Sequence, residues 1–203
     1  MIKNVVFDFG QVLVHFIPAY MVGKFVQDGQ DSELLQQVVF DRLYWDKLDA
    51  GTITDEEVLT AIKARIPERL WRVSEEIYTR WIENIPEIDG MRELVGYIKE
   101  KYGVRLFLLS NISEYFAEHA DEIDMLKLLD KCIFSAVCRR VKPNREIFEY
   151  LCSSCGIEAE ETVFVDDNEK NICGAEAYGI RGYLFDGDVE RLRSYLDGIL
   201  SEQ

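Results

Sequence analysis

The chain has 203 residues, 48% of them hydrophobic and 30% charged, which is the balance of a globular protein with one medium core or a core plus a small inserted unit. Its formal net charge of −15 repels polyanions, so nucleic acids and anionic membranes are not expected as partners. A phosphate ligand is compatible with such a chain only where lysines, backbone N–H groups or a metal ion supply local positive charge.

The beginning of the chain and its cysteines indicate a cellular location. The apolar run within residues 1–8 is too short for a signal peptide and lacks a cleavage signature. No stretch has the length needed to span a bilayer. The five cysteines are odd in number, and without an export signal they are expected to be reduced thiols. We therefore expect a cytoplasmic protein.

The first predicted element is a short strand. Residues 2–7 are rich in Val, Ile and Phe, and the run ends abruptly at Asp8, with Gly10 two positions later. A short, continuous apolar run of this kind predicts a buried strand, and its carboxyl end carries an acidic residue.

The segment from 17 to about 88 has helical periodicity instead. Its hydrophobic residues recur at helical spacing, and Thr54 with Glu57 forms a capping box that opens one of the helices. Gly90 marks the exit of the segment. Because no strand pattern is found in it, we predict an all-helical insertion, or cap, over residues 16–89.

Strands and helices alternate in the remainder of the chain. The stretch after Lys142 is predicted to be a helix with Pro143 in its first turn. The alternation predicts an α/β fold with a Rossmann-like, mostly parallel sheet covered by helices on both faces. Residues 1–15 and 90–203 would form this core. Further strands are predicted at residues 104–109, around 133–135, at 162–165 and near 183–185.

Polar residues gather where these strands end, which is where ligands bind in parallel sheets. Single residues of this kind are commonly simple caps and turns. Four such segments in this order are much harder to explain by capping alone. The four segments are Asp8, Ser110-Asn111, Lys142 and Asp166-Asp167.

These side chains fit phosphoryl-transfer chemistry. Asp8 and one carboxylate of the Asp166-Asp167 pair can share a hard cation such as Mg²⁺, which prefers oxygen ligands, whereas without a cation the carboxylates would repel one another. Asp8 could then attack a phosphorus atom. Lys142 adds positive charge, and Ser110 can donate a hydrogen bond to a phosphoryl oxygen.

As a set, the four segments resemble the motifs of the haloacid dehalogenase superfamily, and the resemblance extends over essentially the whole chain, including a helical cap after the first motif. The matching segments are Phe7-Asp8-Phe9-Gly10-Gln11-Val12-Leu13, Leu108-Leu109-Ser110-Asn111, Val141-Lys142-Pro143, and Phe164-Val165-Asp166-Asp167-Asn168 followed by Asn171.

The resemblance implies a Mg²⁺-dependent phosphatase that acts on a small phosphorylated metabolite. Asp8 would be the nucleophile and would be transiently phosphorylated. The Asp8 carboxylate, the Gly10 carbonyl and Asp167 would bind the metal.

The resemblance also assigns the phosphate-binding groups and their support. Ser110, Asn111 and Lys142 would bind the phosphoryl group. Asp166, supported by Asn171, would orient Lys142 or a water molecule.

Two positions depart from the family pattern. Most of the family's phosphatases have Asp as general acid and base where this chain has Gly10, and Thr where it has Val12. The form found here is similar to a bacterial subgroup containing alpha-D-glucose-1-phosphate phosphatase, which also has a cap segment like residues 51–54. Because general acid catalysis contributes on the order of 10²–10⁴ in rate, its loss favours a good leaving group such as the anomeric oxygen of a sugar 1-phosphate.

Several residues could compensate or shape the substrate site. His15 and Asp46 are candidate proton donors, although a lone His is more often structural. Trp45 could line the substrate pocket or pack within the cap. Arg139 could reach the substrate, although a solvated surface arginine is the simpler interpretation.

Two alternatives remain open, and a third is excluded. A catalytically weak or dead family member that binds a phosphorylated ligand or a protein is supported by Gly10 and Val12, but the intact Asp8 argues against it. A metal-independent 2-haloacid dehalogenase would lack the Asp166-Asp167 pair. Bacterial receiver domains place the acidic pair after the first strand and are excluded, because here the pair comes last.

Overall fold

A five-stranded, all-parallel sheet forms the centre of the larger part of the molecule, in a computed structural model that describes residues 1–201. The strand order is β3-β2-β1-β4-β5. The strand that carries Asp8 at its end therefore lies in the middle of the sheet, which explains its complete burial. The strands are β1 (Asn4–Phe7), β2 (Arg105–Ser110), β3 (Lys131–Phe134), β4 (Thr162–Asp166) and β5 (Arg181–Leu184).

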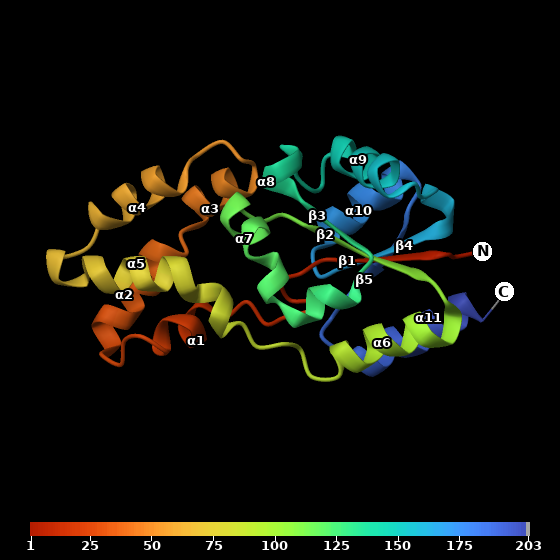
Figure 1. Cartoon of the computed structure of the whole chain (residues 1–203), viewed down its shortest axis with the longest axis horizontal. Coiled ribbons are helices and arrows are strands. Elements are labelled where there is room, and N and C mark those ends of the chain that lie inside the picture. The colour runs from red at the N-terminus through yellow and green to blue at the C-terminus, as the bar shows by residue number, and fades with distance from the viewer. Residues whose placement is uncertain (202–203) are drawn as a thin grey trace.

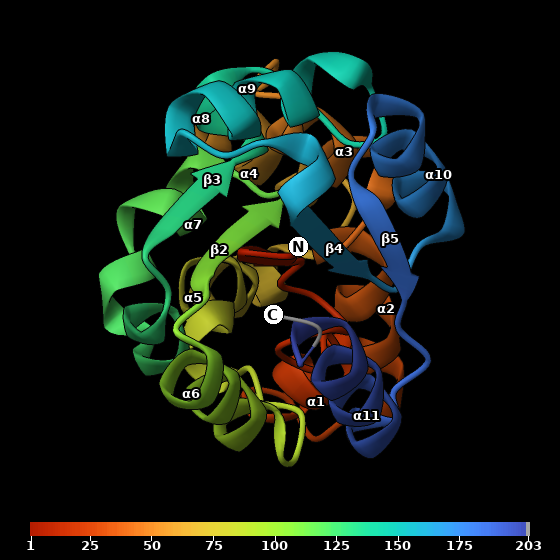
Figure 2. The same ribbon diagram turned by 90° about the vertical axis from the view of Figure 1, so that its right-hand side faces the viewer.

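Helices cover both faces of the sheet, as Figure 2 shows in a view along the long axis of the molecule. Successive residues of β1 point to opposite faces. Val5 and Phe7 belong to one hydrophobic cluster, and Val6 belongs to the other. The first cluster includes α6 (Met91–Tyr102) and α11 (Val189–Leu200), and the second includes α9 (Arg145–Cys155) and α10 (Glu169–Tyr178). The predicted α/β fold class is confirmed.

The remaining core helices are short and lie in the connections after β2, after β3 and before β4. No helix in residues 1–201 combines the length and the apolar character that crossing a membrane requires. The short elements are α7 (Glu114–Glu118), η3 (Ala120–Glu122), η4 (Asp124–Leu128), α8 (Ser135–Cys138) and η5 (Ala159–Glu161).

The helix predicted to begin with Pro143 in its first turn begins later than expected. Residue Asn144 is extended, and α9 starts at Arg145. The side chain of Asn111 accepts a hydrogen bond from the backbone N–H of Lys142 (2.8 Å) and donates one to its carbonyl (3.0 Å). These two bonds fix Lys142 in a loop, so the prediction placed the helix start two residues too early.

The regular elements between β1 and α6 are all helices, and they lie at one end of the elongated molecule (Figure 1). The capping box of Thr54 and Glu57 is present at the start of α4. The elements of this segment are α1 (Pro18–Gly23), α2 (Gly29–Val39), α3 (Arg42–Asp49), α4 (Asp55–Lys63), η1 (Glu68–Leu70), α5 (Trp71–Arg80) and η2 (Trp81–Asn84).

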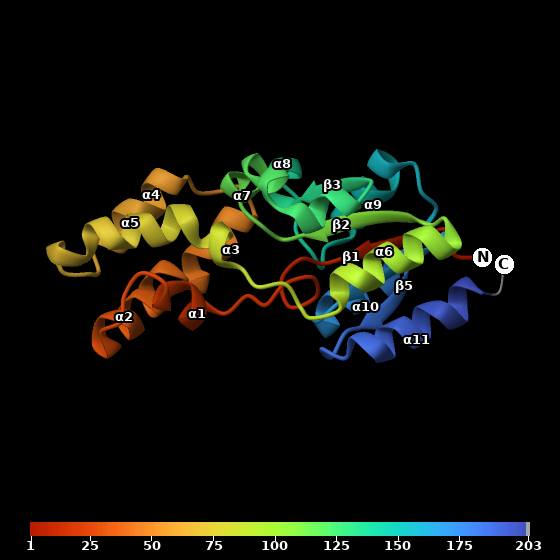
Figure 3. The same cartoon turned by 60° about the horizontal axis from the view of Figure 1, so that its bottom comes forward.

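Two chain segments join the helical segment to the core, and they run side by side (Figure 3). Val14 and Glu87 form an isolated antiparallel bridge. The His15 N–H donates to the Pro86 carbonyl at 2.8 Å, and the Ile88 N–H donates to the Leu13 carbonyl at 3.0 Å. The entrance and exit of the helical segment are thus one paired ribbon.

The helical segment also docks on the core through the turn after α3. The Ser135 hydroxyl, at the start of α8, donates to the Asp49 carbonyl at 2.5 Å. Gly51 has a φ of +65°, and a Cβ atom there would lie 2.8 Å from the Ala136 carbonyl oxygen. Only a glycine lets the two backbones approach this closely.

Replacing Gly51 by Ala is expected to loosen this docking. A left-handed conformation costs a residue with a Cβ roughly 1–2 kcal/mol, and the Cβ atom would in addition collide with Ala136. Faster amide hydrogen exchange at residues 49–51 and 135–138 would report the loosening. Gly103→Ala is the matched control, because Gly103 has a φ of +63° with no atom within 4 Å of the added Cβ. Equal exchange in the two variants would contradict the docking role.

Candidate active site

Asp8 lies directly beyond the central strand. Its backbone N–H donates to the Val165 carbonyl at 2.9 Å, so the parallel ladder between β1 and β4 continues to this residue. The Phe9 N–H donates to Asp8 Oδ1 at 2.7 Å. Burial raises the pKa of Asp8 to about 6, with Lys142 acting to lower it and the Asp166 carboxylate to raise it.

Lys142 supplies a buried positive charge beside this carboxylate. Its side chain is 1% exposed, and Nζ lies 2.8 Å from Asp8 Oδ1 and 2.7 Å from Asp166 Oδ2. Burial alone would lower the pKa of a lysine, but the two carboxylates outweigh it and raise the pKa of Lys142. The lysine is therefore held in its charged form between the two acids.

Asp166 is buried at the end of β4, where hydrogen-bond donors surround it. The Asn168 N–H donates to its Oδ1 at 2.8 Å, and Asn171 Nδ2 lies 3.0 Å from each of its oxygens. Asn171 comes from the first turn of α10, which Asn168 caps. Asp166 is thus engaged by Lys142 and by two asparagines, as expected of a residue that orients the lysine.

Three carboxylates are close enough to hold one cation. Asp8, Asp166 and Asp167 each offer an oxygen within 4.8 Å of the others. Since the oxygens of Asp166 already accept hydrogen bonds, Asp8 and the exposed Asp167 are the groups with capacity for a metal ion. Hard carboxylate oxygens on an open side of the cluster fit Mg²⁺, which keeps several of its own waters.

Three further residues of the predicted site lie at the end of β2 or shortly after the ends of β1 and β2. Ser110 is the last residue of β2 and is buried. Asn111, expected to bind the phosphoryl group, instead uses its amide to fix the backbone of Lys142. Gly10 lies in the turn after Asp8, where an added Cβ would meet only the Cβ of Phe16, at an ordinary 3.8 Å.

Trp45 is buried inside the helical segment. It is 6% exposed, and its indole N–H donates to the Val39 carbonyl at 2.7 Å. Its ring lies 5.2–5.5 Å from those of Phe16, Phe40 and Trp81. Of the two roles considered for Trp45, these contacts support packing, because the aromatic cluster and the indole hydrogen bond satisfy the side chain.

The two candidate proton donors both face solvent. His15 is exposed on the paired ribbon. The Asp46 side chain is 61% exposed and forms an ion pair with Arg42 at 2.7 Å, one turn earlier on α3.

Asp49, the last residue of α3, is the acidic residue that the sequence analysis missed. It is 6% exposed, and its buried Oδ1 has no hydrogen-bond partner among the described residues. Burial raises its pKa to about 8; Arg42 acts to lower it, and Asp46 and Asp8 act to raise it. Its place directly before the docking turn at Gly51 was the one available signal.

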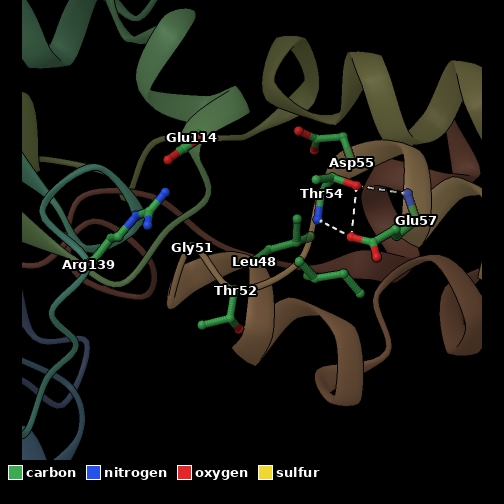
Figure 4. A pocket seen from close by; sticks show the side chains of 9 residues that line it. Leu48, Gly51, Thr52, Thr54, Asp55, Glu57, Glu114 and Arg139 are labelled. Atoms are coloured by element: carbon green, nitrogen blue, oxygen red, sulfur yellow. Dashed lines mark hydrogen bonds between the residues drawn. The ribbon is translucent and has the colours of Figure 1, made fainter.

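A cavity of about 310 Å³ lies between the docking turn and the core, shown in Figure 4. Arg139 and Glu114 approach it from the core, and Thr52 and Asp55 belong to the helical segment. Arg139 is thus beside the docking turn, whereas the neighbouring Arg140 donates to the Cys138 carbonyl at 2.6 Å.

Comparisons with known proteins agree with this geometry. The family model of the haloacid dehalogenase-like hydrolases matches residues 2–179. A D-ribitol-5-phosphate phosphatase from Bacteroides thetaiotaomicron is 27% identical over 180 residues, which cover 85% of this chain and 86% of that protein. The sesquiterpene phosphatase astK from Aspergillus oryzae is 31% identical over 183 residues, covering 89% and 88%.

Solved structures share the fold. A haloacid dehalogenase family enzyme from Bacteroides thetaiotaomicron, in complex with magnesium and inorganic phosphate, superposes with a TM-score of 0.71 over 95% of this chain and 99% of that one, at 20% identity. The motif residues gathered around Asp8 and Lys142, the sheet order and the match of the family model together lead to one conclusion: the chain belongs to the haloacid dehalogenase-like hydrolase family.

Proposed function

We propose that this protein is a Mg²⁺-dependent phosphatase that hydrolyses a small phosphorylated metabolite through an aspartyl-phosphate on Asp8. The observation that carries the proposal is the contact between Asp8 and the buried Lys142, which are 2.8 Å apart. The carboxylates of Asp166 and Asp167 lie beside this contact. A pure binding protein has no need for a nucleophile aligned with a buried lysine. Two relatives named as phosphatases support the same reaction class.

Each residue of the cluster has a separate role in the proposed reaction. Asp8 attacks phosphorus, and Lys142 and Ser110 stabilise the negative charge on the phosphoryl oxygens. Asp166 and Asn171 hold Lys142 in place, and Asn111 fixes the lysine's loop.

The metal would be held by the Asp8 carboxylate, the Gly10 carbonyl and Asp167. When bound, Mg²⁺ neutralises charge on the phosphoryl group and on the clustered carboxylates. The related structure from Bacteroides thetaiotaomicron, which contains magnesium and inorganic phosphate, supports this choice of ion.

Residues 16–89 would act as a cap over the core formed by residues 1–15 and 90–203. The turn at Gly51 seats the cap on α8, and the stacking of Trp81 on Phe116, with ring centroids 5.7 Å apart, adds a second contact. A closed cap excludes water while the aspartyl-phosphate forms, and opening releases the product.

The substrate is a small phosphorylated metabolite, and the expectation of a sugar 1-phosphate rests on the missing acid at position 10. One relative is named for ribitol 5-phosphate, an ester of a primary alcohol, and another for a sesquiterpene. A proton donor elsewhere in the site would remove the need for an anomeric leaving group.

Phosphate release from p-nitrophenyl phosphate tests the proposal. We expect turnover with Mg²⁺ and its loss on chelation with EDTA, restored by excess Mg²⁺, because the carboxylate cluster needs a cation before an anionic substrate can approach. Absence of turnover with Mg²⁺ would favour the catalytically inactive alternative. Haloacetate hydrolysis in the presence of EDTA would instead favour a dehalogenase.

A further inference from the structure

The leaving group of a phosphate monoester needs a proton, and the usual position for the donor is empty in this chain. Gly10 has no side chain, Asp46 is paired with Arg42 at the surface, and His15 is exposed. If no other group supplied the proton, only esters with good leaving groups would be hydrolysed efficiently.

Asp49 is a buried carboxyl group with one oxygen unpartnered among residues 1–201, and it lies within electrostatic reach of the cluster. The residue is more than nine-tenths buried, and its Oδ1 has no hydrogen-bond partner in the described part of the chain. It lies near enough to Asp8 and Lys142 for both charges to act on it. A buried, unpartnered carboxyl group is costly, so its retention beside a reactive cluster calls for a ligand that would complete its hydrogen bonding.

The local structure favours the protonated form of Asp49. The residue ends α3, where the helix dipole disfavours a negative charge. Burial acts in the same direction and raises its pKa to about 8, with the Asp8 carboxylate adding to the effect. The side chain therefore carries a proton at neutral pH.

The backbone of Asp49 is held firmly against the core. Its carbonyl accepts the hydrogen bond from Ser135, and two residues later Gly51 lies against the Ala136 carbonyl. The Asp49 side chain therefore reaches the cluster around Asp8 only when the turn at Gly51 is in contact with α8. This dependence couples the donor to cap closure.

We propose that Asp49 of the cap is the catalytic proton donor to the leaving-group oxygen, in place of the acid that is absent at position 10. The assignment rests on the proposed phosphatase function and deepens it. It widens the expected substrates from sugar 1-phosphates to phosphate esters of ordinary alcohols.

The two half-reactions balance. An Asp8 carboxylate oxygen forms a bond to phosphorus while the bond from phosphorus to the ester oxygen breaks, and the Asp49 proton moves to that oxygen to give the free alcohol. Water then attacks phosphorus, gives a proton to the Asp49 carboxylate, and displaces Asp8. Inorganic phosphate leaves, and both aspartates return to their initial states.

The experiment compares two esters with each variant: p-nitrophenyl phosphate, whose leaving group needs no proton, and n-butyl phosphate, whose leaving group does. We expect Asp49→Asn to lower kcat/KM for n-butyl phosphate by about 10²–10⁴-fold and to change that for the aryl ester far less. Glu76→Gln, on helix α5 of the cap and paired with Arg72 at the surface, is the matched control and should preserve the ratio between the two esters.

A rescue variant separates a chemical role from a structural one. Position 10 has room for a side chain, so adding Gly10→Asp to Asp49→Asn should restore turnover of n-butyl phosphate. An equal fall for both esters, no fall for either, a selective loss in Glu76→Gln, or a wild type that cleaves only the aryl ester would overturn the assignment. A wild type that cleaves neither ester with Mg²⁺ would overturn the phosphatase function itself, and the donor role with it.

Discussion

Replacing Asp8 by Asn is expected to lower kcat for p-nitrophenyl phosphate by at least about 10⁴-fold, as removal of a nucleophile typically does. An amide oxygen is a far weaker nucleophile than a carboxylate, and Asn also removes one carboxylate oxygen from the proposed metal site. Steady-state release of p-nitrophenol measures the effect, and acid quenching of the wild type with labelled substrate should trap the phosphorylated protein that the variant cannot form.

The fold should survive this substitution, because Lys142 keeps its contact with Asp166 at 2.7 Å. Thermal melting of the variant checks that point. Asp186→Asn, an exposed aspartate paired with Arg191, serves as a control for the loss of one surface charge. Turnover of Asp8→Asn within tenfold of the wild type would show that another residue is the nucleophile.

Replacing Lys142 by Met is expected to reduce the free energy of unfolding by about 3–5 kcal/mol, the usual cost of removing one partner from a buried ion pair. The side chain is 1% exposed and lies between two carboxylates, which would lose their neighbouring positive charge. Turnover should also fall sharply, because the charge that stabilises the transferred phosphoryl group is lost.

Urea denaturation with EDTA present measures this effect without a contribution from bound metal. Lys127→Met is the matched control, because Lys127 forms an exposed ion pair with Asp124 and such pairs contribute about 0–1 kcal/mol. A loss below about 1 kcal/mol for Lys142→Met would mean that Asp8, whose pKa burial already raises, takes up a proton and relaxes easily once the lysine is gone.

Much of the core and its site could be predicted because each feature is local in sequence. The apolar run that ends at Asp8 becomes the central strand, and the acidic pair after β4 comes to lie beside it, since the carboxyl ends of parallel strands meet at one edge. The capping box at Thr54 was recognisable for the same reason, because its donors and acceptors are three residues apart.

The features that the sequence did not reveal depend on contacts between distant segments. The resemblance assigns Asn111 to the phosphoryl group, and the sequence gives no sign that its amide fixes the backbone of Lys142, 31 residues away along the chain. Asp49 drew no attention because an aspartate at the end of a helix is ordinary on a surface. In the structure it is buried, two residues before the turn where Gly51 meets Ala136.

The paired ribbon that joins cap and core restricts how the protein opens. Because Val14 and Glu87 are bridged, and their neighbours exchange hydrogen bonds, the two connections bend together. A double-stranded strip flexes across its flat face more readily than within its plane. We therefore expect the cap to rotate about a single axis and to return to the same position on the core at each turnover.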